Sequence, residues 1–306
     1  MNTSEKKWSN SRKWVVAAAG IFLVSGIACG IYGFLIEPNR LVVKRHDIRP
    51  AKLDRAFEGL KIVVISDLHG GSNFVTVEKL KHVVSTVNAQ NPDLIVILGD
   101  FVSQARWGDP VVREPLRMPM KTIAGSIEGL EAKYGVFAVI GNHDFWYDQD
   151  TVKKELEAVG IDVLFDEIHE LDINGSALSL LGLRDHASIH SYKKYLDEIK
   201  PAALKARGDV IVLTHSPDVV PYMTVGFATA TRTRLVLAGH THGGQVWLPG
   251  LGSLIVPSSY GQTFAFGYVN FNGVDVFITS GIGTSILPVR FMMPPEIAVL
   301  TLRSNQ

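Results

Sequence analysis

Short apolar runs recur along most of this chain, and they restrict its fold more than any other feature. Runs this short and this rich in Val and Ile are typical of buried strands. Seven of them stand between about residue 60 and the C-terminus: Leu60–Ile65, Leu94–Leu98, Val136–Ile140, Val210–Leu213, Leu235–Leu237, Val274–Ile278 and Ile297–Leu302.

Helical patterns separate some of these runs. Leu80, Val83 and Val87 fall on one stripe of a helix, and a second helical pattern runs from Val152 to a terminating Gly160. Strands that alternate with helices indicate an α/β fold. Because no repeat, low-complexity tract or second boundary interrupts this part of the chain, we expect one domain over residues 60–306.

Polar residues follow five of the apolar runs directly. In α/β sheets, ligands bind at the carboxyl ends of the strands, so these residues should converge in one crevice although they are far apart in sequence. The five clusters are Ser66-Asp67-Leu68-His69, Gly99-Asp100, Gly141-Asn142-His143-Asp144, Thr214-His215-Ser216 and Gly239-His240-Thr241-His242.

The side chains of these clusters form a set of metal ligands. Oxygen and imidazole donors together suit Zn, Mn or Fe, and the set is too rich in imidazole for Ca or Mg. One ion cannot use all of them, whereas two ions about 3.5–4 Å apart, bridged by a carboxylate, activate water and clamp the oxygens of a phosphoryl transfer. The candidate residues are Asp67, His69, Asp100, Asn142, His143, His215, His240 and His242.

The segment GHTHGGQ (residues 239–245) places two histidines close together. In an extended segment, residues i and i+2 point to the same side, so His240 and His242 should face one crevice together. We interpret the remaining, isolated histidines as structural or surface residues. These are His46, His82, His169, His186 and His190.

Composition excludes several classes of function. The chain has no net charge, is 46% hydrophobic and 20% charged, and so resembles a globular protein rather than one that binds nucleic acid through a broad basic surface. Its single cysteine, Cys29, lies in an N-terminal apolar segment. The globular part therefore has no thiol for a disulfide, a thiolate metal site or a nucleophile.

The N-terminal segment Trp14–Ile36 runs for 23 residues without a charge. As a helix it would be about 35 Å long, enough to cross a bilayer, so we expect a single-pass anchor. A cleaved signal peptide and a lipoprotein site at Cys29 are alternatives, but the run is long for the first and Gly26 does not suit the second. Flanking Lys and Arg residues lean only weakly toward a globular part outside the cytoplasm.

The expected organisation follows from these segments. Residues 1–13 form a basic tail, 14–36 the anchor, 37–59 a polar linker and 60–306 the domain. Within the domain, Ser103–Lys121 is irregular, with three prolines, and resembles an inserted loop.

The five clusters resemble the signature of the calcineurin-like metallophosphoesterase superfamily: Asp-x-His, Gly-Asp-x-x-Asp, Gly-Asn-His-Asp/Glu, a lone His and Gly-His-x-His. The resemblance implies a four-layer α/β/β/α sandwich, a phosphorylated small molecule or lipid as substrate, and no obligate protein partner. It also implies that one metal is held by Asp67, His69 and His242, the other by Asn142, His215 and His240, with Asp100 as the bridge.

By the same resemblance, His143 is not a ligand but contacts the phosphate as a general acid or electrostatic stabiliser, and Asp144 orients it. The chain departs from the signature at one position, because Ser103 stands where the second aspartate of Gly-Asp-x-x-Asp is usual. This departure leaves the local loop geometry and the choice of substrate open.

The C-terminal segments GIGTSILPVRF and MPPEIAVLTL look like those of bacterial membrane-anchored phosphoesterases, which include proteins similar to UDP-2,3-diacylglucosamine pyrophosphatases. The implied location is the bacterial inner membrane. Two features bear on a lipid substrate. Val246–Val269 would line an acyl groove or, as we favour, form a hairpin packed in the core. Loop residues would touch head groups or, as we favour, be solvated: Arg106, Trp107, Arg113 and Arg117.

Three alternatives stay open from the sequence. A nuclease or another phosphodiesterase would use the same clusters, although the neutral composition argues against a nucleic-acid partner. A catalytically silent, membrane-tethered metal-binding protein would keep the ligands without turnover. A metal-dependent amide or ester hydrolase would use His-x-His but does not account for the Gly-Asn-His-Asp cluster.

Overall fold

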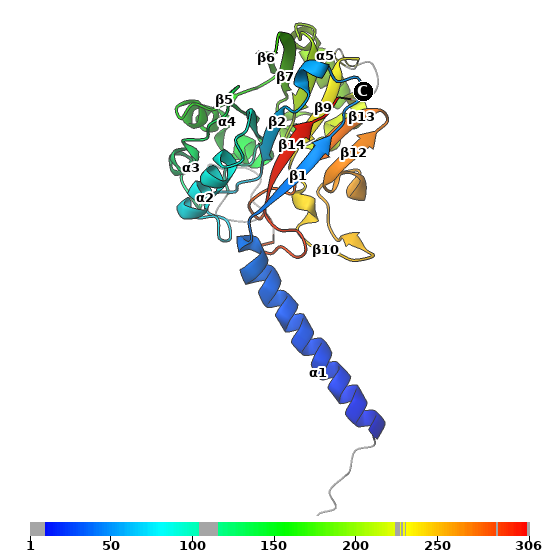
Figure 1. Ribbon diagram of the computed structural model, residues 1–306. Helices are drawn as coiled ribbons and strands as arrows, with labels where there is room; N and C mark the ends of the chain where they lie inside the picture. Colours follow the sequence, from blue (N-terminus) through cyan, green and yellow to red (C-terminus); the bar gives the residue numbers. More distant parts are fainter. Residues whose placement is uncertain are drawn as a thin grey trace, which may run out of the picture.

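The computed structural model describes residues 10–103, 116–223, 227, 229, 231–285 and 287–304. Two six-stranded sheets lie face to face in the globular part, and a long N-terminal helix projects from it (Figure 1). Helices pack on the outer face of each sheet, which gives the four layers α/β/β/α. The predicted fold class is therefore confirmed.

The first sheet has the strand order β1-β14-β2-β3-β4-β5. Strands β2 to β5 are parallel, β14 is antiparallel to β2, and β1 is parallel to β14. The carboxyl ends of β2, β3 and β4 therefore share one edge with the amino ends of β1 and β14. The bounds are β1 (Val42–Ile48), β2 (Lys61–Ile65), β3 (Leu94–Ile97), β4 (Val136–Ala138), β5 (Asp162–Val163) and β14 (Glu296–Leu302).

The second sheet has the order β12-β13-β9-β8-β7-β6, with β7, β8, β9 and β13 parallel and the two outer strands antiparallel to their neighbours. A separate two-stranded hairpin, β10–β11, follows β9. The bounds are β6 (Glu167–Ile173), β7 (Ser176–Gly182), β8 (Asp209–Leu213), β9 (Thr233–Ala238), β10 (Trp247–Leu248), β11 (Gly252–Ser253), β12 (Gly267–Phe271) and β13 (Val274–Ile278).

Helices α2 (Val77–Asn88), α3 (Met120–Ile127) and α4 (Asn142–Glu157) cover the first sheet, while α5 (Tyr192–Ala203) and α6 (Val220–Met223) cover the second. Helix α2 shows why these segments are helical. The Thr76 side chain accepts a hydrogen bond from the Lys79 amide at its start, and the predicted apolar stripe is buried.

Three apolar layers separate the four structural layers. Alternate residues of each strand point to opposite faces, so Ile62 and Val64 of β2 enter the layer between the sheets, whereas Val63 and Ile65 pack against the helices. All four side chains are fully buried. This packing on both faces holds the strand ends rigidly, and those ends carry the polar clusters.

The segment 37–59, which we expected to be a linker, is built into the fold. Val42–Ile48 forms β1, an edge strand that pairs along its whole length with β14. The prediction of a polar linker outside the domain was wrong because β-pairing with a segment more than 250 residues away cannot be seen in the local pattern of the strand, VVKRHDI, which is half polar.

The N-terminal segment is helical from Asn10 to Asn39. It consists of α1 (Asn10–Ile31), a short π-helix (Tyr32–Ile36) and a 3-10 turn (Glu37–Asn39). Its mean hydropathy reaches 2.2 over the most apolar window, none of which is buried, so it is long and apolar enough to cross a membrane. The end of the segment docks on the domain. Gly33, Glu37 and Pro38 are buried there, so the helix joins the domain without a flexible gap.

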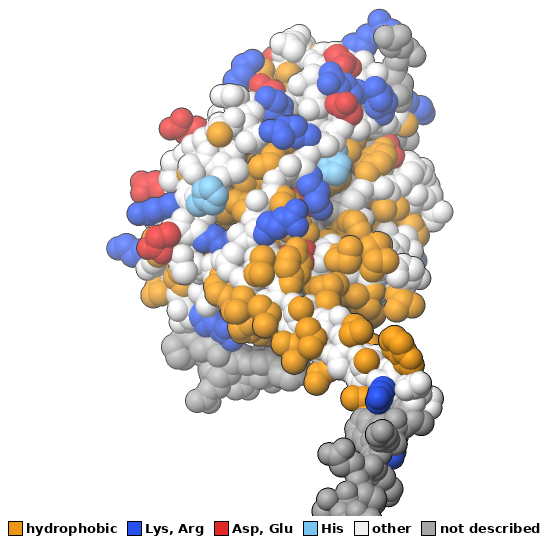
Figure 2. Space-filling view, turned by 60° about the horizontal axis from the view of Figure 1, so that its bottom comes forward, with side chains coloured by type: hydrophobic (Ala, Val, Ile, Leu, Met, Phe, Trp, Pro, Cys, Tyr) orange, Lys and Arg blue, Asp and Glu red, His pale blue; other side chains and the backbone are white. Residues whose placement is uncertain are grey.

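Two further segments of the domain were singled out from the sequence. The segment Val246–Val269 was expected to form a hairpin packed in the core, but Leu251 is 71% and Ile255 69% exposed, and its buried residues are Ser253, Phe264 and Ala265. Apolar side chains gather on this face, beside the base of α1 (Figure 2). Of the expected insertion Ser103–Lys121, residues 104–115, including Arg106, Trp107 and Arg113, lie outside the described residues.

Candidate metal centre

The loops that follow the strands turn sharply at the predicted ligands. Left-handed backbone angles are uncommon for residues other than glycine, and they gather at functional sites where the surrounding structure enforces them. Here they coincide with five candidate residues, whose φ values are 54° for Asp67, 46° for His69, 56° for Asp100, 70° for His240 and 52° for His242.

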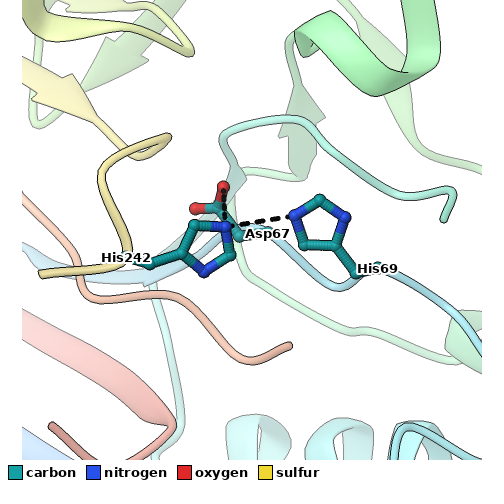
Figure 3. A group of neighbouring side chains, drawn as sticks. All are labelled: Asp67, His69 and His242. Atoms are coloured by element: carbon teal, nitrogen blue, oxygen red, sulfur yellow. Dashed lines mark hydrogen bonds and ion pairs between the residues drawn. The ribbon is translucent and has the colours of Figure 1, made fainter. Parts of the chain in front are cut away.

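Asp67, His69 and His242 form a first group (Figure 3). Nε2 of His242 lies 3.1 Å from Nε2 of His69 and 3.4 Å from Oδ1 of Asp67. All three side chains are buried. Two imidazole nitrogens and a carboxylate oxygen that lie this close together form an arrangement that could hold one ion.

A second group lies around His215, which follows β8. Its Nε2 atom is 3.1 Å from Oδ1 of Asn142 and 3.2 Å from Nδ1 of His240. The Asn142 and His215 side chains are buried, and the first residue of α4 is Asn142 itself. The second predicted ligand set is therefore also assembled at the strand ends.

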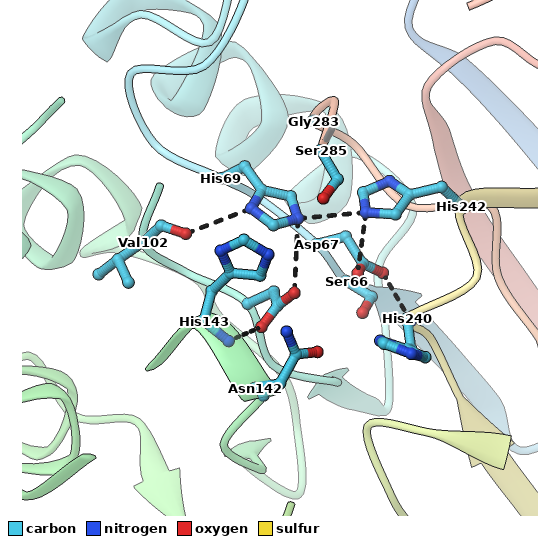
Figure 4. Close-up of polar contacts among 12 residues, drawn as sticks. Ser66, Asp67, His69, Val102, Asn142, His143, His240, His242, Gly283 and Ser285 are labelled. Atoms are coloured by element: carbon cyan, nitrogen blue, oxygen red, sulfur yellow. Dashed lines mark hydrogen bonds and ion pairs between the residues drawn. The ribbon is translucent and has the colours of Figure 1, made fainter. Parts of the chain in front are cut away.

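Asp100 lies between the two groups. Its Oδ2 atom is 3.5 Å from Nε2 of His69 and 3.3 Å from Nε2 of His215, while its Oδ1 atom accepts a hydrogen bond from the His143 amide. This position suits a bridging carboxylate. The His143 ring stands edge-on to the His69 ring, with centroids 4.8 Å apart, and also falls within ligand distance of His69 and Asp100 (Figure 4).

Backbone carbonyls determine which ring nitrogen of two histidines faces the site. Nδ1 of His69 lies 3.2 Å from the Val102 carbonyl oxygen, and Nδ1 of His215 lies 2.6 Å from that of Leu98. In both residues Nε2 is the atom that faces the other ligands. In His69, whose pKa is lowered by burial, a neutral ring that donates from Nδ1 keeps an unprotonated Nε2.

Burial and local charge set the protonation of the site. Burial lowers the pKa of His69 to about 3 and lowers the pKa values of His240 and His242 as well, so these rings are neutral near pH 7. Burial raises the pKa of Asp67 to about 6. Burial disfavours the charged forms of Asp100 and His215, but the attraction between the two side chains outweighs it. The pKa of Asp100 is therefore lowered and the pKa of His215 is raised.

The residues present fit a divalent cation. Oδ1 of Asp67 is buried and accepts no hydrogen bond from the described residues, whereas its Oδ2 atom accepts one from the His240 amide. A buried carboxylate oxygen without a donor is costly unless a cation satisfies it. The backbone also approaches closely, since a Cβ at Gly239 would lie 2.8 Å from Oδ2 of Asp67.

The backbone of residues 239–245 differs from the extended conformation that we expected. His240 and His242 both have left-handed angles, and Thr241 between them is helical. The two rings still reach the site, His242 in the first group and His240 in the second. Thr241 is buried and donates from its hydroxyl to the Ala265 carbonyl, which fixes the turn.

Asp144 has a structural task in the loop that carries Asp100, beside the role that the sequence predicted for it. Its carboxylate accepts four backbone hydrogen bonds: Oδ2 from Asp100 and Gly141, and Oδ1 from Phe101 and Val102. These four bonds fill the acceptor sites of a carboxylate. Asp144 therefore holds the loop that carries Asp100, and its orientation of the His143 ring stays a prediction.

Asp185 and His186 were missed by the sequence reasoning. His186 was interpreted as structural or surface, but its ring contacts the His240 ring, with centroids 4.6 Å apart. Its Nδ1 atom lies 3.0 Å from the buried carboxylate of Asp185. The two residues follow β7 closely, so the strand-end rule would have found them had SALSLLG been recognised as a strand.

Arg290 is a second residue that the sequence did not single out. Its guanidinium is fully buried and donates to the carbonyl oxygens of Ser280, Gly283 and Met293. Nη2 also lies 3.3 Å from Nδ1 of His242. Arg290 thus ties together the C-terminal loops that back the first ligand group, a role visible only from the contacts of the folded chain.

Comparison with known proteins identifies the family. The sequence profile described as calcineurin-like phosphoesterase matches residues 60–244, which contain all five ligand-bearing clusters. The chain belongs to the calcineurin-like phosphoesterase family. The resemblance inferred from the motifs is confirmed, and with it the expectation that the protein is a metal-dependent phosphoesterase.

Three relatives of this phosphoesterase, from two bacteria and a fish, resemble it over most of its length. The uncharacterized metallophosphoesterase YkuE of Bacillus subtilis is 31% identical over 91% of this chain and 92% of its own length. The phosphodiesterase YaeI of Escherichia coli is 26% identical over 96% and 99%. A transmembrane protein with a metallophosphoesterase domain from Danio rerio is 26% identical over 92% of this chain, which spans only 62% of that relative.

Proposed function

We propose that this phosphoesterase is a membrane-anchored dimetal hydrolase that cleaves a phosphoester or pyrophosphate bond, with a membrane lipid precursor such as a UDP-diacylglucosamine as its substrate. The observation that carries the dimetal part is the position of Asp100, whose Oδ2 atom faces both His69 and His215. A carboxylate shared by two ligand groups suits a pair of ions.

The chain's own residues have separate tasks in this proposal. Asp67, His69 and His242 would hold one divalent ion, Asn142, His215 and His240 the other, and Asp100 both. Mn, Zn or Fe ions bound there would supply Lewis-acid activation of water and of the phosphate oxygens. The His143 ring stands beside His69 without being needed in either set, so it is placed to donate a proton to the leaving oxygen.

The lipid part of the proposal is supported by the N-terminal helix. Its base is built into the domain, and the apolar segment is the length of a bilayer crossing. A domain held at a membrane meets lipid substrates at high local concentration. The name of the Escherichia coli relative, a phosphodiesterase, makes a diester a further substrate class for this site.

Hydrolysis by the purified full chain in detergent tests the proposal. The protein is stripped with a chelator, reloaded with Mn, Zn or Fe, and assayed on an aryl phosphomonoester, an aryl phosphodiester, nucleotides, phospholipids and UDP-diacylglucosamine. We expect metal-dependent turnover that Asp100→Ala abolishes, because the variant loses the ligand common to both groups.

Asp197→Ala is the matched control, since Asp197 is an exposed carboxylate on α5. Full activity in Asp100→Ala would overturn the proposed mechanism. Activity on aryl esters without activity on any lipid would support the hydrolase and contradict the lipid substrate. Stoichiometric metal without turnover on any substrate would favour the silent metal-binding protein.

A further inference from the structure

Large apolar side chains are exposed beside the hairpin β10–β11 and in the segment before β14. The hairpin lies at the end of the domain from which α1 emerges (Figure 1), and apolar side chains gather on the face shown in Figure 2. We call five of them the apolar rim: Leu251, Leu254, Ile255, Leu287 and Met292. Their exposed fractions are 71%, 56%, 69%, 49% and 47%, so about half or more of each side chain is left uncovered by the described residues. Soluble monomers rarely gather this much apolar surface at one place without a partner.

The rim is bonded to the base of the N-terminal helix. The Met292 amide donates to Oε2 of Glu37, and the Arg290 amide donates to the Gly33 carbonyl. The Tyr32 and Phe291 rings meet edge to face, with centroids 6.0 Å apart. These contacts attach the loop that carries Leu287 and Met292 to the end of the helix.

The hairpin that carries the rest of the rim is joined to the same loop. The Trp247 amide of β10 donates to the Phe291 carbonyl, and Val246 bridges to Phe291. The Leu254 amide in turn donates to the Val246 carbonyl. Hydrogen bonds thus run from the helix through Phe291 to the hairpin, which fixes the distance of the rim from the helix.

Strand directions place the metal centre at the same end of the molecule. Helical structure ends at Asn39, and Val42 starts β1 opposite Glu296 at the start of β14. Because β14 is antiparallel to β2, this edge is also the carboxyl end of β2, directly before Asp67. In Figure 1 the helix leaves the domain from this end.

We propose that the apolar rim is a second membrane contact, which inserts into the interfacial region of the bilayer that α1 spans and seats the metal-centre end of the domain on the lipid surface. The inference rests on the anchor part of the proposed function. A bilayer that receives α1 lies next to the face from which the helix emerges, and the rim lies on that face. The occupant is therefore lipid rather than a second protein.

The chemistry of the surrounding residues agrees with a lipid surface. Tyr32 and Trp247 flank the rim at the helix base and on the hairpin, and aromatic residues with a polar atom favour the membrane interface. Arg40 is exposed just beyond the helix end, and its guanidinium lies 3.3 Å from the Tyr32 hydroxyl. A cation at that depth is attracted to anionic head groups.

The contact has a consequence for the metal centre. The Gly283 amide donates to the Asp67 carbonyl, and Gly283 and Ser285 lie beside His69 and His242 (Figure 4). Leu287 of the rim stands two positions after Ser285 in the sequence. A rim held in the interface keeps this loop at the lipid head groups. Phosphate esters of membrane lipids are then presented to the site without leaving the bilayer.

Fluorescence quenching in vesicles tests the proposal on the full chain. Cys29, the only cysteine, is replaced by Ser, and a single cysteine is introduced by Leu254→Cys for labelling with an environment-sensitive fluorophore. The matched control is Leu204→Cys, because Leu204 is 57% exposed and Leu254 56%. Leu204 follows α5 and precedes the amino end of β8, away from the strand ends that carry the site.

The labelled proteins are reconstituted in phosphatidylcholine and phosphatidylglycerol vesicles with spin-labelled acyl chains. We expect roughly threefold or greater quenching at position 254 than at 204, since a rim in the interface brings the probe to the quencher. Co-flotation of the protein with vesicles reports the anchor separately, and no step needs bound metal or hydrolysis.

Three outcomes would overturn the proposal. If the protein floats with the vesicles but quenching is equal at the two positions, the rim does not contact the bilayer. That result would not affect the proposed anchor or the proposed hydrolase activity. A probe at position 254 that is shielded only at high protein density indicates contact with a second copy. Protein that does not float with the vesicles removes the anchor and the rim together.

Discussion

The His186 ring stands against the His240 ring, with centroids 4.6 Å apart and planes at 61°. Because Asp185 lies 3.0 Å from Nδ1 of His186 and is buried, it fixes the ring from behind. The contact therefore supports one ligand of the second group from outside that group.

The first prediction follows from this contact. His186→Ala should weaken metal binding roughly tenfold, because partners that orient a ligand ring typically contribute that much. Isothermal titration of chelator-stripped protein with Mn²⁺ measures it. His190→Ala, four residues away and exposed, is the control and should bind as the unaltered chain does. Equal affinities in the two variants would show that His186 does not support the site.

His143 should act in turnover rather than in metal binding. His143→Asn is expected to lower kcat about a hundredfold, the usual contribution of a general acid, while two metal ions per chain are retained. Steady-state kinetics and metal analysis on one preparation separate the two effects. Loss of one ion per chain would assign His143 to the ligand group that it forms with His69 and Asp100.

Asp144 should matter first for stability. In the unaltered chain, backbone N–H groups donate to both carboxylate oxygens of Asp144. Asp144→Asn replaces one of these oxygens by an amide nitrogen, which cannot accept, and each buried donor left unpaired costs about 1–3 kcal/mol. We expect the free energy of unfolding to fall by about 3 kcal/mol, as measured by denaturant titration. A stable variant that has lost only activity would instead support the catalytic role expected from the sequence.

Gly141 should not tolerate a side chain. A Cβ there would lie 2.3 Å from Oδ1 of Asp100, so Gly141→Ala must displace the carboxylate shared by both ligand groups. We expect metal affinity and turnover to fall at least about tenfold, because ligand geometry is strict. Gly125→Ala in α3 is the control, since a Cβ there meets no atom within 4 Å and alanine favours a helix.

His46 should make the fold sensitive to acid. Burial lowers its pKa, and its Nε2 atom has no hydrogen-bond partner among the described residues. The unfolded chain therefore binds a proton more readily than the folded chain just below pH 6.5, so His46 removes stability as the pH falls through that window. A group whose pKa is raised in the folded state would have the opposite effect and would add stability as the pH falls.

Denaturant titrations at pH 7.5 and pH 5 test this expectation. The free energy of unfolding should fall less between the two values for His46→Gln than for the unaltered chain. His82→Gln, at an exposed position on α2, should behave as the unaltered chain does. Identical pH dependence in all three proteins would rule out His46 as a source of acid sensitivity.

The sequence was sufficient for the fold class and for the residues that gather at the site. Apolar runs such as Leu94–Leu98 specify buried strands by local composition, and a polar residue placed directly after such a run, such as Asp100, must lie at a carboxyl end. Both signals are contiguous in the chain. For that reason the predicted candidates His69, His215 and Asp100 are found side by side.

Only the tertiary structure decided how these residues are held. Strand β1 exists through pairing with β14, Asp144 serves backbone amides of a loop more than 40 residues away, and His186 reaches His240 across the sheet. His240 and His242 face the site from left-handed backbone instead of an extended strand. Contacts between distant segments depend on the packing of the whole chain, and local sequence carries no signal for them.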